Sequence, residues 1–158
     1  LFSEKTYYRG NWYIAGTTIT CLPNGFLHSF DDRPSVQNAS MIEWHYKDLL
    51  HRNHQLYARV RNRMINRHKF YWYKYGRFHR DYDKPAIVSP KKYIWMYNNL
   101  CHRDEDNPAV IYANGVLEYW KNGLRHRSGN KPAIVYKNGC VEHWLNNGRY
   151  YPHQSGSN

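Results

Sequence analysis

The stretch from His102 to Tyr151, HRDEDNPAVIYANGVLEYWKNGLRHRSGNKPAIVYKNGCVEHWLNNGRYY, contains one ordered pattern twice. His-Arg, Pro-Ala, Asn-Gly and a glutamate close to a tryptophan recur in this order about 24 residues apart. An order of residue types that recurs at a fixed spacing is typical of proteins built from stacked structural units. The pattern therefore predicts a repeat fold.

Copies of the pattern run back to residue 25. Gly-x-x-His occurs at 25–28, 76–79 and 123–126, and two further histidines take the same place without the glycine. The histidines are 23, 28, 23 and 24 residues apart and define five units, which cover roughly 28–50, 51–78, 79–101, 102–125 and 126–150. In most units proline follows the histidine after six residues and tryptophan after 16 to 18. We expect these recurring residues to build the repeat: His28, His79, His102, His126, Pro34, Pro85, Pro108, Pro132, Trp44, Trp95, Trp120 and Trp144.

Each unit has the pattern of a β-hairpin. In PAVIYANGVLEYW (108–120) and PAIVYKNGCVEHW (132–144), alternating runs flank Asn114-Gly115 and Asn138-Gly139. Asn-Gly favours positive φ at both turn positions, which suits the right-handed twist of paired strands. Proline has no N–H to donate, so we expect Pro-Ala at the start of a strand. The prediction is an antiparallel meander of about ten short strands.

The expected fold class is all-β, an elongated meander of about five hairpin repeats of 23–28 residues with degenerate end units as caps. The 16 Tyr and 6 Trp suit the pleated surface of a thin sheet. We expect a cap segment at 1–24, the repeat domain at 25–151 and a flexible tail at 152–158. No apolar run reaches the roughly 18 residues of a membrane span.

Two segments carry a resemblance to a known family. WKNGLRH at 120–126 and WYKYGRFH at 72–79 resemble the W-x-x-G-x-x-H core of membrane occupation and recognition nexus (MORN) repeats, and YANG at 112–115 resembles their Y-x-x-G segment. Here arginine replaces the usual glycine after the histidine, and a loop with Asp or Asn and Pro-Ala is inserted. This variant resembles uncharacterised repeat proteins of large DNA viruses, of Marseillevirus type.

The resemblance covers about 25–151. It implies hairpin units in an elongated, twisted sheet, and a role as a scaffold or a membrane-associated interaction module. For a viral protein it also implies the host cytoplasm, the viral factory or the virion as location. Three scattered cysteines without a CxxC pair favour a reducing, intracellular compartment.

The positive charge of the chain is local. The formal net charge is +11, and the segment from His45 to Arg80 has ten Lys or Arg against one acid. A basic segment of this kind indicates an acidic partner such as nucleic acid or an anionic lipid surface. The second unit, 51–78, is the irregular one, because it lacks Pro-Ala and reaches its tryptophan, Trp72, only after 21 residues.

This irregular unit is the candidate binding site. If 59–64 is a strand, Arg59, Arg61 and Arg63 share one face at intervals of about 6.6 Å, close to the phosphate spacing of a nucleic-acid strand. Basic side chains interleaved with aromatic rings fit single-strand stacking or contact with a duplex backbone. The predicted polyanion-binding residues are Arg59, Arg61, Arg63, Arg67, Lys69, Lys74, Arg77, Arg80, Tyr71 and Tyr73.

Two alternatives stay open for this segment. As a helix, 59–69 would present a basic, weakly amphipathic face to a groove or an anionic membrane. As a strand, it could be a solvated basic edge or an assembly surface, because Lys and Arg on edges prevent sheets from pairing with one another.

The repeated His-Arg pair has a functional and a structural interpretation. It could form a ladder of cations for phosphate or metal. We favour the structural interpretation, in which these side chains pack on the tryptophan of a neighbouring unit and bind the loop carboxylates. Glu43, Glu118 and Glu142 are then cross-strand partners for Lys or Arg.

No cofactor, metal site or catalytic centre is predicted. His51 and His54 form the tightest histidine cluster, and no second cluster completes a four-ligand set. No nucleophile motif or glycine-rich phosphate loop occurs. The sequence predicts a non-catalytic basic repeat protein that binds nucleic acid or another polyanion non-specifically, such as a viral DNA-associated or virion protein. The alternatives are a scaffold that assembles through sheet edges, and an anionic-lipid-binding module.

Overall fold

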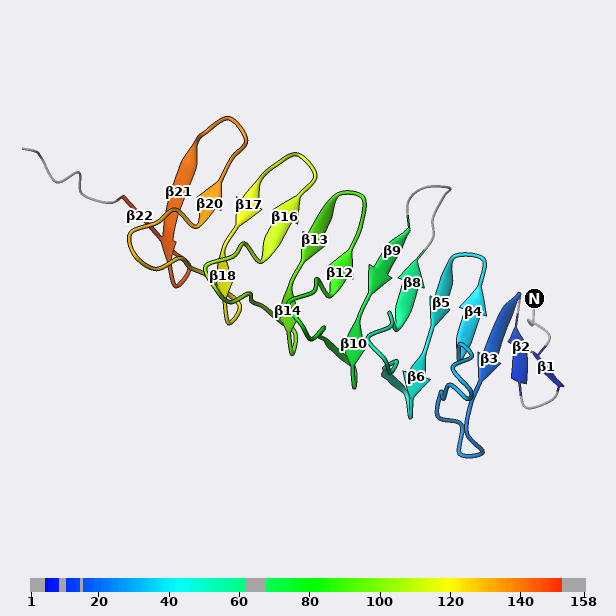
Figure 1. Cartoon of the computed structure of the whole chain (residues 1–158). Coiled ribbons are helices and arrows are strands. Elements are labelled where there is room, and N and C mark those ends of the chain that lie inside the picture. Colours follow the sequence, from blue (N-terminus) through cyan, green and yellow to red (C-terminus); the bar gives the residue numbers. More distant parts are fainter. Residues whose placement is uncertain (1–4, 9–10, 15, 62–67, 152–158) are drawn as a thin grey trace, which may run out of the picture.

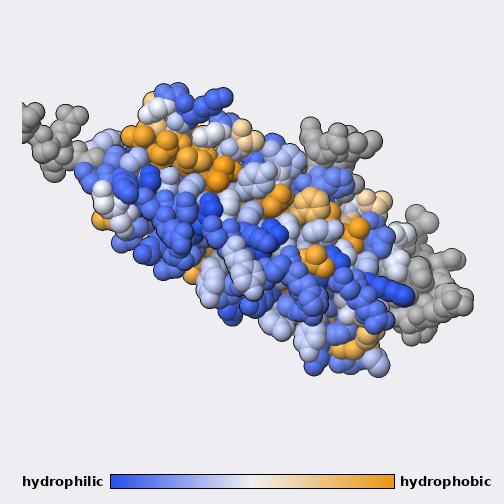
Figure 2. Space-filling view, in the orientation of Figure 1, coloured by the Kyte–Doolittle hydropathy of each residue, from blue (hydrophilic) through white to orange (hydrophobic). Residues whose placement is uncertain are grey.

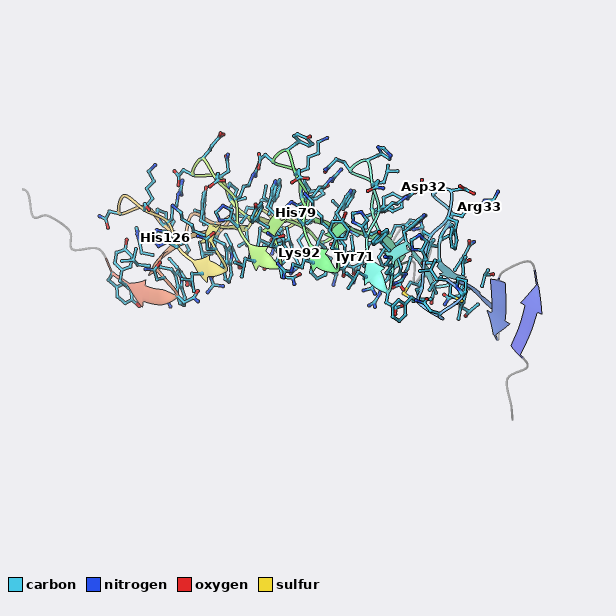
Figure 3. The ribbon with its side chains drawn as sticks, turned by 90° about the horizontal axis from the view of Figure 1, so that it is seen from below. Asp32, Arg33, Tyr71, His79, Lys92 and His126 are labelled. Carbon is cyan, nitrogen blue, oxygen red and sulfur yellow. The ribbon has the colours of Figure 1, made fainter. Side chains whose placement is uncertain are left out.

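The computed structural model describes residues 5–8, 11–14, 16–61 and 68–151, with side chains from residue 16 onward. These residues form an elongated, arched ribbon of strands (Figures 1 and 3). No helix in the described part of the chain is long and apolar enough to span a membrane. The predicted all-β class and the elongated antiparallel meander are confirmed.

The main sheet has 14 antiparallel strands that follow one another in chain order. They are β1 (Lys5–Tyr8), β2 (Asn11–Ile14), β3 (Thr17–Thr20), β4 (Val36–Asn38), β5 (Met41–Glu43), β8 (Arg59–Arg61), β9 (Lys69–Tyr71), β12 (Ile87–Val88), β13 (Lys92–Ile94), β16 (Val110–Tyr112), β17 (Leu117–Glu118), β20 (Ile134–Val135), β21 (Val141–Leu145) and β22 (Gly148–Tyr150).

Each of the first four units adds a second, smaller hairpin, which lies below the main sheet in Figure 1. The prediction of one hairpin per unit missed these. They are β6 (His45–Tyr46) with β7 (Leu49–Leu50), β10 (Tyr73–Lys74) with β11 (Arg77–Phe78), β14 (Met96–Tyr97) with β15 (Leu100–Cys101), and β18 (Trp120–Lys121) with β19 (Leu124–Arg125). A turn between β21 and β22 takes this place in the last unit.

Two consecutive positive φ angles occur in the turns of the small hairpins and in the His-Arg loops, but not at the described tips of the main-sheet hairpins. Asn122 and Gly123 have φ of 50° and 79°, as a tight two-residue hairpin turn requires. Asn114-Gly115 was expected to form such a turn, and there the prediction was wrong. Only Gly115 has positive φ, at 88°, and the Tyr112 amide donates to the Val116 carbonyl across a three-residue tip. Asn138-Gly139 behaves in the same way.

A small buried residue begins the first main-sheet strand of every unit. Its exposed fraction is 0% in all five units, at Ser35, Ala58, Ala86, Ala109 and Ala133. The backbone N–H of each donates across the hairpin, for example from Ala58 to the Tyr71 carbonyl at 2.9 Å. The irregular unit therefore keeps the buried alanine, with tyrosine instead of proline before it.

The two faces of the main sheet differ in character. Residues opposite one another in an antiparallel sheet share a face, and one row along the ribbon is almost wholly apolar from β5 onward. It consists of Ile42, Val60, Phe70, Val88, Tyr93, Ile111, Leu117, Val135 and Val141. We call this the apolar row. Figure 2 shows apolar surface over the hairpins of β16, β17, β20 and β21 and polar surface below them.

The His-Arg loops lie on the same face of the ribbon as the apolar row, farther from the hairpin tips. We call this face the loop face. In Figure 3, Asp32 and Arg33 stand on the loop side of the ribbon, whereas Tyr71 and Lys92 lie on the strand side. We call the second side the back face.

The predicted row of tryptophans is not a single structural position. The backbone amides of Trp44, Trp72 and Trp95 each donate to the backbone carbonyl of the buried alanine in the next unit. In the fourth unit the amide of Tyr119 makes this hydrogen bond. Trp120 therefore lies one residue later, on the back face. The cause is the hairpin tip, which is one residue longer in this unit, and a one-residue shift turns a strand side chain to the other face. Trp144, predicted as equivalent, is displaced in the same way, after His143.

Candidate functional site

Most arginines of the His-Arg pairs sit in a seat that the preceding unit builds. The Arg103 guanidinium lies 3.9 Å from the ring centroid of Trp95. Its Nε and Nη2 donate to the two carboxylate oxygens of Asp83 at 2.7 and 2.8 Å. Its Nη1 donates to the carbonyl of Pro108 at 3.2 Å. Cation–π stacking and a bidentate ion pair thus join the third unit to the fourth.

The same arrangement recurs at two other junctions. Arg52 stacks on Trp44 at 3.9 Å and binds Asp32 through Nε and Nη2, each at 2.7 Å. Arg127 stacks on Tyr119 at 3.6 Å and binds Asp106 at 2.7 and 3.1 Å. We number the junctions along the chain, so that Arg52, Arg80, Arg103 and Arg127 belong to the first, second, third and fourth.

Hydrogen bonds from these arginines hold the pKa of the loop carboxyls of Asp32, Asp83 and Asp106 below its usual range. The carboxylates are therefore charged in the folded protein at neutral pH.

The histidines bridge successive units. His102 Nδ1 accepts a hydrogen bond from the Asn122 amide at 3.0 Å, in the turn of the next small hairpin. Its Nε2 lies 3.2 Å from the Asp104 carboxylate. His79 makes the equivalent contacts with Asn98 and Asp81, at 3.3 and 2.7 Å. With both ring nitrogens engaged in this way, His79 and His102 each link their own loop to the next small hairpin along the chain.

The structure distributes the predicted polyanion-binding residues over both faces. Arg59, Arg61, Lys69, Tyr71 and Tyr73 belong to the back face. On the other side, Lys74 and Arg77 face each other on a small hairpin and Arg80 stacks on Trp72. Arg63 and Arg67 lie outside the described residues. Residues 59–61 and 69–71 are strands, so the helical alternative does not apply to these parts.

Several of these residues already have partners within the chain. Arg59 pairs with Glu43, and its Nη1 lies 3.4 Å from the Tyr73 hydroxyl. Tyr73 is buried and stacks on Phe78. Lys74 Nζ lies 3.6 Å from Asp81. These residues stabilise the ribbon, and they are poor candidates for contact with a polyanion.

Arg61 and Lys69 have no such partner. They are opposite each other on β8 and β9, both are exposed, and neither has an ion pair within the described part of the chain. Lys91 and Lys92 stand at the tip of the third main-sheet hairpin, and Lys137 stands at the tip of the fifth. We call these five cations together the tip edge: Arg61, Lys69, Lys91, Lys92 and Lys137. Within the described residues, no tip of the second to fifth hairpins contains an acid.

Arg80 occupies the only one of the four described junctions that lacks an aspartate. Gln55 stands in the place of Asp32 and Asp83, and its amide donates to Asp81 at 3.0 Å. Arg80 keeps its stacking on Trp72 at 3.7 Å and its bond to the Pro85 carbonyl. Its buried Nε has no partner in the described part of the chain, and burial lowers the pKa of the guanidinium. Sequence reasoning missed this defect, although an alignment of the units at the fourth residue after each histidine reveals it.

No three His, Cys, Asp or Glu side chains of the described residues come together as metal ligands could. Burial raises the pKa of the Cys101 thiol to about 12, which keeps it protonated and unreactive. The grooves of the loop face lie between successive His-Arg loops and have volumes of about 210 to 320 Å³.

Comparisons with family models, with curated proteins and with solved structures find no match for this chain.

Proposed function

We propose that the protein is a non-catalytic repeat ribbon that binds the phosphate backbone of nucleic acid along the tip edge. The observation that carries the proposal is the pair Arg61 and Lys69. Like charges placed directly opposite on neighbouring strands destabilise a sheet. This pair has no acid to offset that cost within the described part of the chain. A phosphate between the two cations would remove the repulsion.

The surroundings of this pair support the same partner. Lys91 and Lys92 stand on the tip of the next hairpin, and Lys92 Nζ lies 5.3 Å from the ring centroid of Tyr112. Neighbouring strands are about 4.8 Å apart, so tips of successive units stand about 10 Å apart. A flexible polyanion can follow such a row of cations and exchange its counterions for them.

The expected binding does not depend on base sequence. The described strands are short, and the described part of the chain contains no helix that could enter a major groove and read the bases there. Contacts between Lys or Arg and phosphates position a protein on nucleic acid without specifying bases. We therefore propose non-specific binding with a steep dependence on salt concentration.

Fluorescence anisotropy with a labelled random-sequence duplex tests the proposal. Binding is measured at several salt concentrations between about 50 and 200 mM for the wild type and for Arg61→Ser/Lys69→Ser/Lys92→Ser. Each lost phosphate contact lowers the slope of log K against log salt by about 1, so the variant slope is expected to fall by up to about 3.

The matched control is Arg33→Ser/Lys84→Ser/Lys121→Ser, which removes the same charge from exposed positions of the loops and a small hairpin. The proposal requires a smaller loss of affinity in this control than in the tip-edge variant. Equal losses would show that only net charge matters, and no binding of the wild type at about 50 mM salt would refute the proposal. Vesicles with acidic lipid, titrated in parallel, show whether the tip edge prefers a membrane surface.

One observation favours a second function, assembly into a scaffold. The apolar row is partly open to solvent, with Tyr93 and Val141 exposed to 46% and 47%. A contiguous apolar strip of this kind is typical of surfaces that bind protein. Sedimentation velocity of the wild type and of Val141→Lys tests this, because a charge in the strip would reduce association if the row mediates it. Association that is equal in both proteins would exclude the apolar row as the interface.

A further inference from the structure

The four junctions differ in one side chain. At the first, third and fourth junctions the Nε and Nη2 edge of the arginine is occupied by an aspartate carboxylate. At the second, Gln55 replaces the aspartate and the Arg80 Nε has no partner among the described residues. The guanidinium fork matches the geometry of a carboxylate or phosphate. The second junction therefore presents a preformed fork that has no carboxylate partner among the described residues.

The backbone of this seat is unchanged. Gln55 has φ of 59°, compared with 56° at Asp32 and 48° at Asp83. Its carbonyl accepts a hydrogen bond from the Trp72 indole at 2.8 Å, as the carbonyl of Asp83 does from Trp95 at 3.0 Å. The aromatic floor and the bond from Arg80 to Pro85 are also kept. Only the carboxylate is absent, so a carboxylate or phosphate from outside would find the other contacts already in place.

The groove at this junction has room and suitable charge. Its volume is about 210 Å³, and it is lined by Lys74, His51, His79 and Arg80, with Asp81 as its only acid among the described lining residues. The corresponding groove at the third junction contains Asp81, Asp83, Asp104 and Glu105. The second groove is thus more favourable for an anion. Asp81 does not prevent binding, because at the third junction Asp104 stands at the equivalent place beside the seated carboxylate of Asp83.

We propose that the groove at the second junction binds an oxyanion, a phosphate or a carboxylate, through the free edge of Arg80. The incoming oxygens take the place that Asp83 takes on Arg103. The Arg80 Nε is buried, so the anion must displace the Gln55 amide and break its hydrogen bond to Asp81. This site lies on the loop face and is distinct from the tip edge.

Stability measurements with and without anion test the proposal. The melting temperature is measured in phosphate, in acetate and in chloride at equal ionic strength and pH. A ligand that binds only the folded state stabilises it by mass action, so phosphate or acetate at several times Kd should raise Tm by about 2 °C or more relative to chloride. A response to phosphate alone identifies a phosphoryl group as the ligand, and a response to acetate as well identifies carboxylates.

Two substitutions make the test specific to this seat. Gln55→Asp supplies the missing carboxylate and should abolish the anion-specific rise in Tm. Asp83→Gln copies the second junction at the third, so it should lower Tm in chloride and enlarge the rise with anion. An anion-specific rise that is the same in Gln55→Asp as in the wild type would overturn the proposal, as would no rise in the wild type.

A direct measurement applies even if a variant folds poorly. The NMR signal of the Arg80 Nε–H, assigned in the wild type through its bonds to the Arg80 backbone, should shift on titration with inorganic phosphate. The Nε–H of Arg103, already paired with Asp83, should not shift. Shifts of equal size at both sites would exclude a specific seat. Gln55→Asp should still bind duplex DNA like the wild type, so failure of this site and failure of the tip edge are distinguishable.

Discussion

Arg103 belongs to the fourth unit and Asp83 to the third, and they are joined by two hydrogen bonds of 2.7 and 2.8 Å. The pair shows how successive units of the ribbon are held together. The side chains of each unit complete the loop of the unit before it, because a single hairpin layer has no second sheet to pack against.

Arg103→Lys should lower the free energy of unfolding by about 1 kcal/mol. Lysine keeps the charge and loses the bidentate fork and most of the stacking on Trp95. Urea unfolding followed by tryptophan fluorescence measures the difference. Lys84→Ala, at an exposed position in the preceding loop, should change stability by less than about 0.5 kcal/mol. Equal effects in the two variants would contradict the role given to the pair.

His45 should make stability fall below about pH 6.5. Burial lowers the pKa of this imidazole, whose Nδ1 lies 2.7 Å from the Ser35 hydroxyl. The folded state therefore favours the neutral ring, and the unfolded chain binds a proton more readily near its ordinary pKa of about 6.5. Stability from this group is present above that pH and is lost as the pH falls through it towards the lower folded pKa.

Urea titrations at several pH values between about 5 and 7.5 measure this slope. His45→Gln should reduce it, whereas the exposed His54→Gln should leave it unchanged. A slope in His45→Gln that equals the wild-type slope would assign the pH dependence to other groups.

Ala109→Val should destabilise the ribbon by about 1–3 kcal/mol. The alanine is fully buried at the entry of β16, and added methyl groups in a packed site force neighbouring groups apart. Ala113→Val, at the exposed tip of the same hairpin, is the matched control and should have little effect. Ala109→Ser should be tolerated better than valine, because Ser35 fills this position in the first unit. Thermal unfolding of the three variants provides the comparison.

Gly123→Ala should cost more than Gly25→Ala. Both glycines have positive φ, 79° and 89°, so both substitutions strain the backbone. A Cβ at Gly123 would also lie 3.1 Å from Leu100 Cδ2, whereas a Cβ at Gly25 would meet nothing within 4 Å. The Leu100→Ala background should therefore reduce the cost of Gly123→Ala, which a double-mutant cycle in urea detects. Strict additivity would show that backbone strain alone sets the cost.

The repeat and its hairpins could be predicted because the residues that build them recur in sequence. The buried Ala58 was overlooked because tyrosine stands where other units have proline. Trp120 was misplaced because spacing along the chain does not reveal that one hairpin tip is a residue longer. Because successive side chains of a strand point to opposite faces, that single extra residue places Trp120 on the other face of the sheet.

The candidate site was predictable only in part. The run of basic residues in the second unit marked the region, and alternation correctly placed Arg59 and Arg61 on one face. The sequence predicted Glu43 as a cross-strand partner for Lys or Arg, and the structure confirms it. The sequence did not identify Arg59 as that partner, because the two residues are 16 positions apart and meet only through strand register. The missing partner of Arg80 could be predicted only by comparing the units at the fourth residue after the histidine. At that position glutamine is a modest change from aspartate and attracts little notice.

The seats of the arginines also give the ribbon a direction. The first unit has Ser29 where later units have arginine, and the last has Asn130 where most have aspartate. Pairing by charge therefore fixes the order in which these units can follow one another. The first unit can supply only the aspartate of such a pair, and the last unit can supply only the arginine.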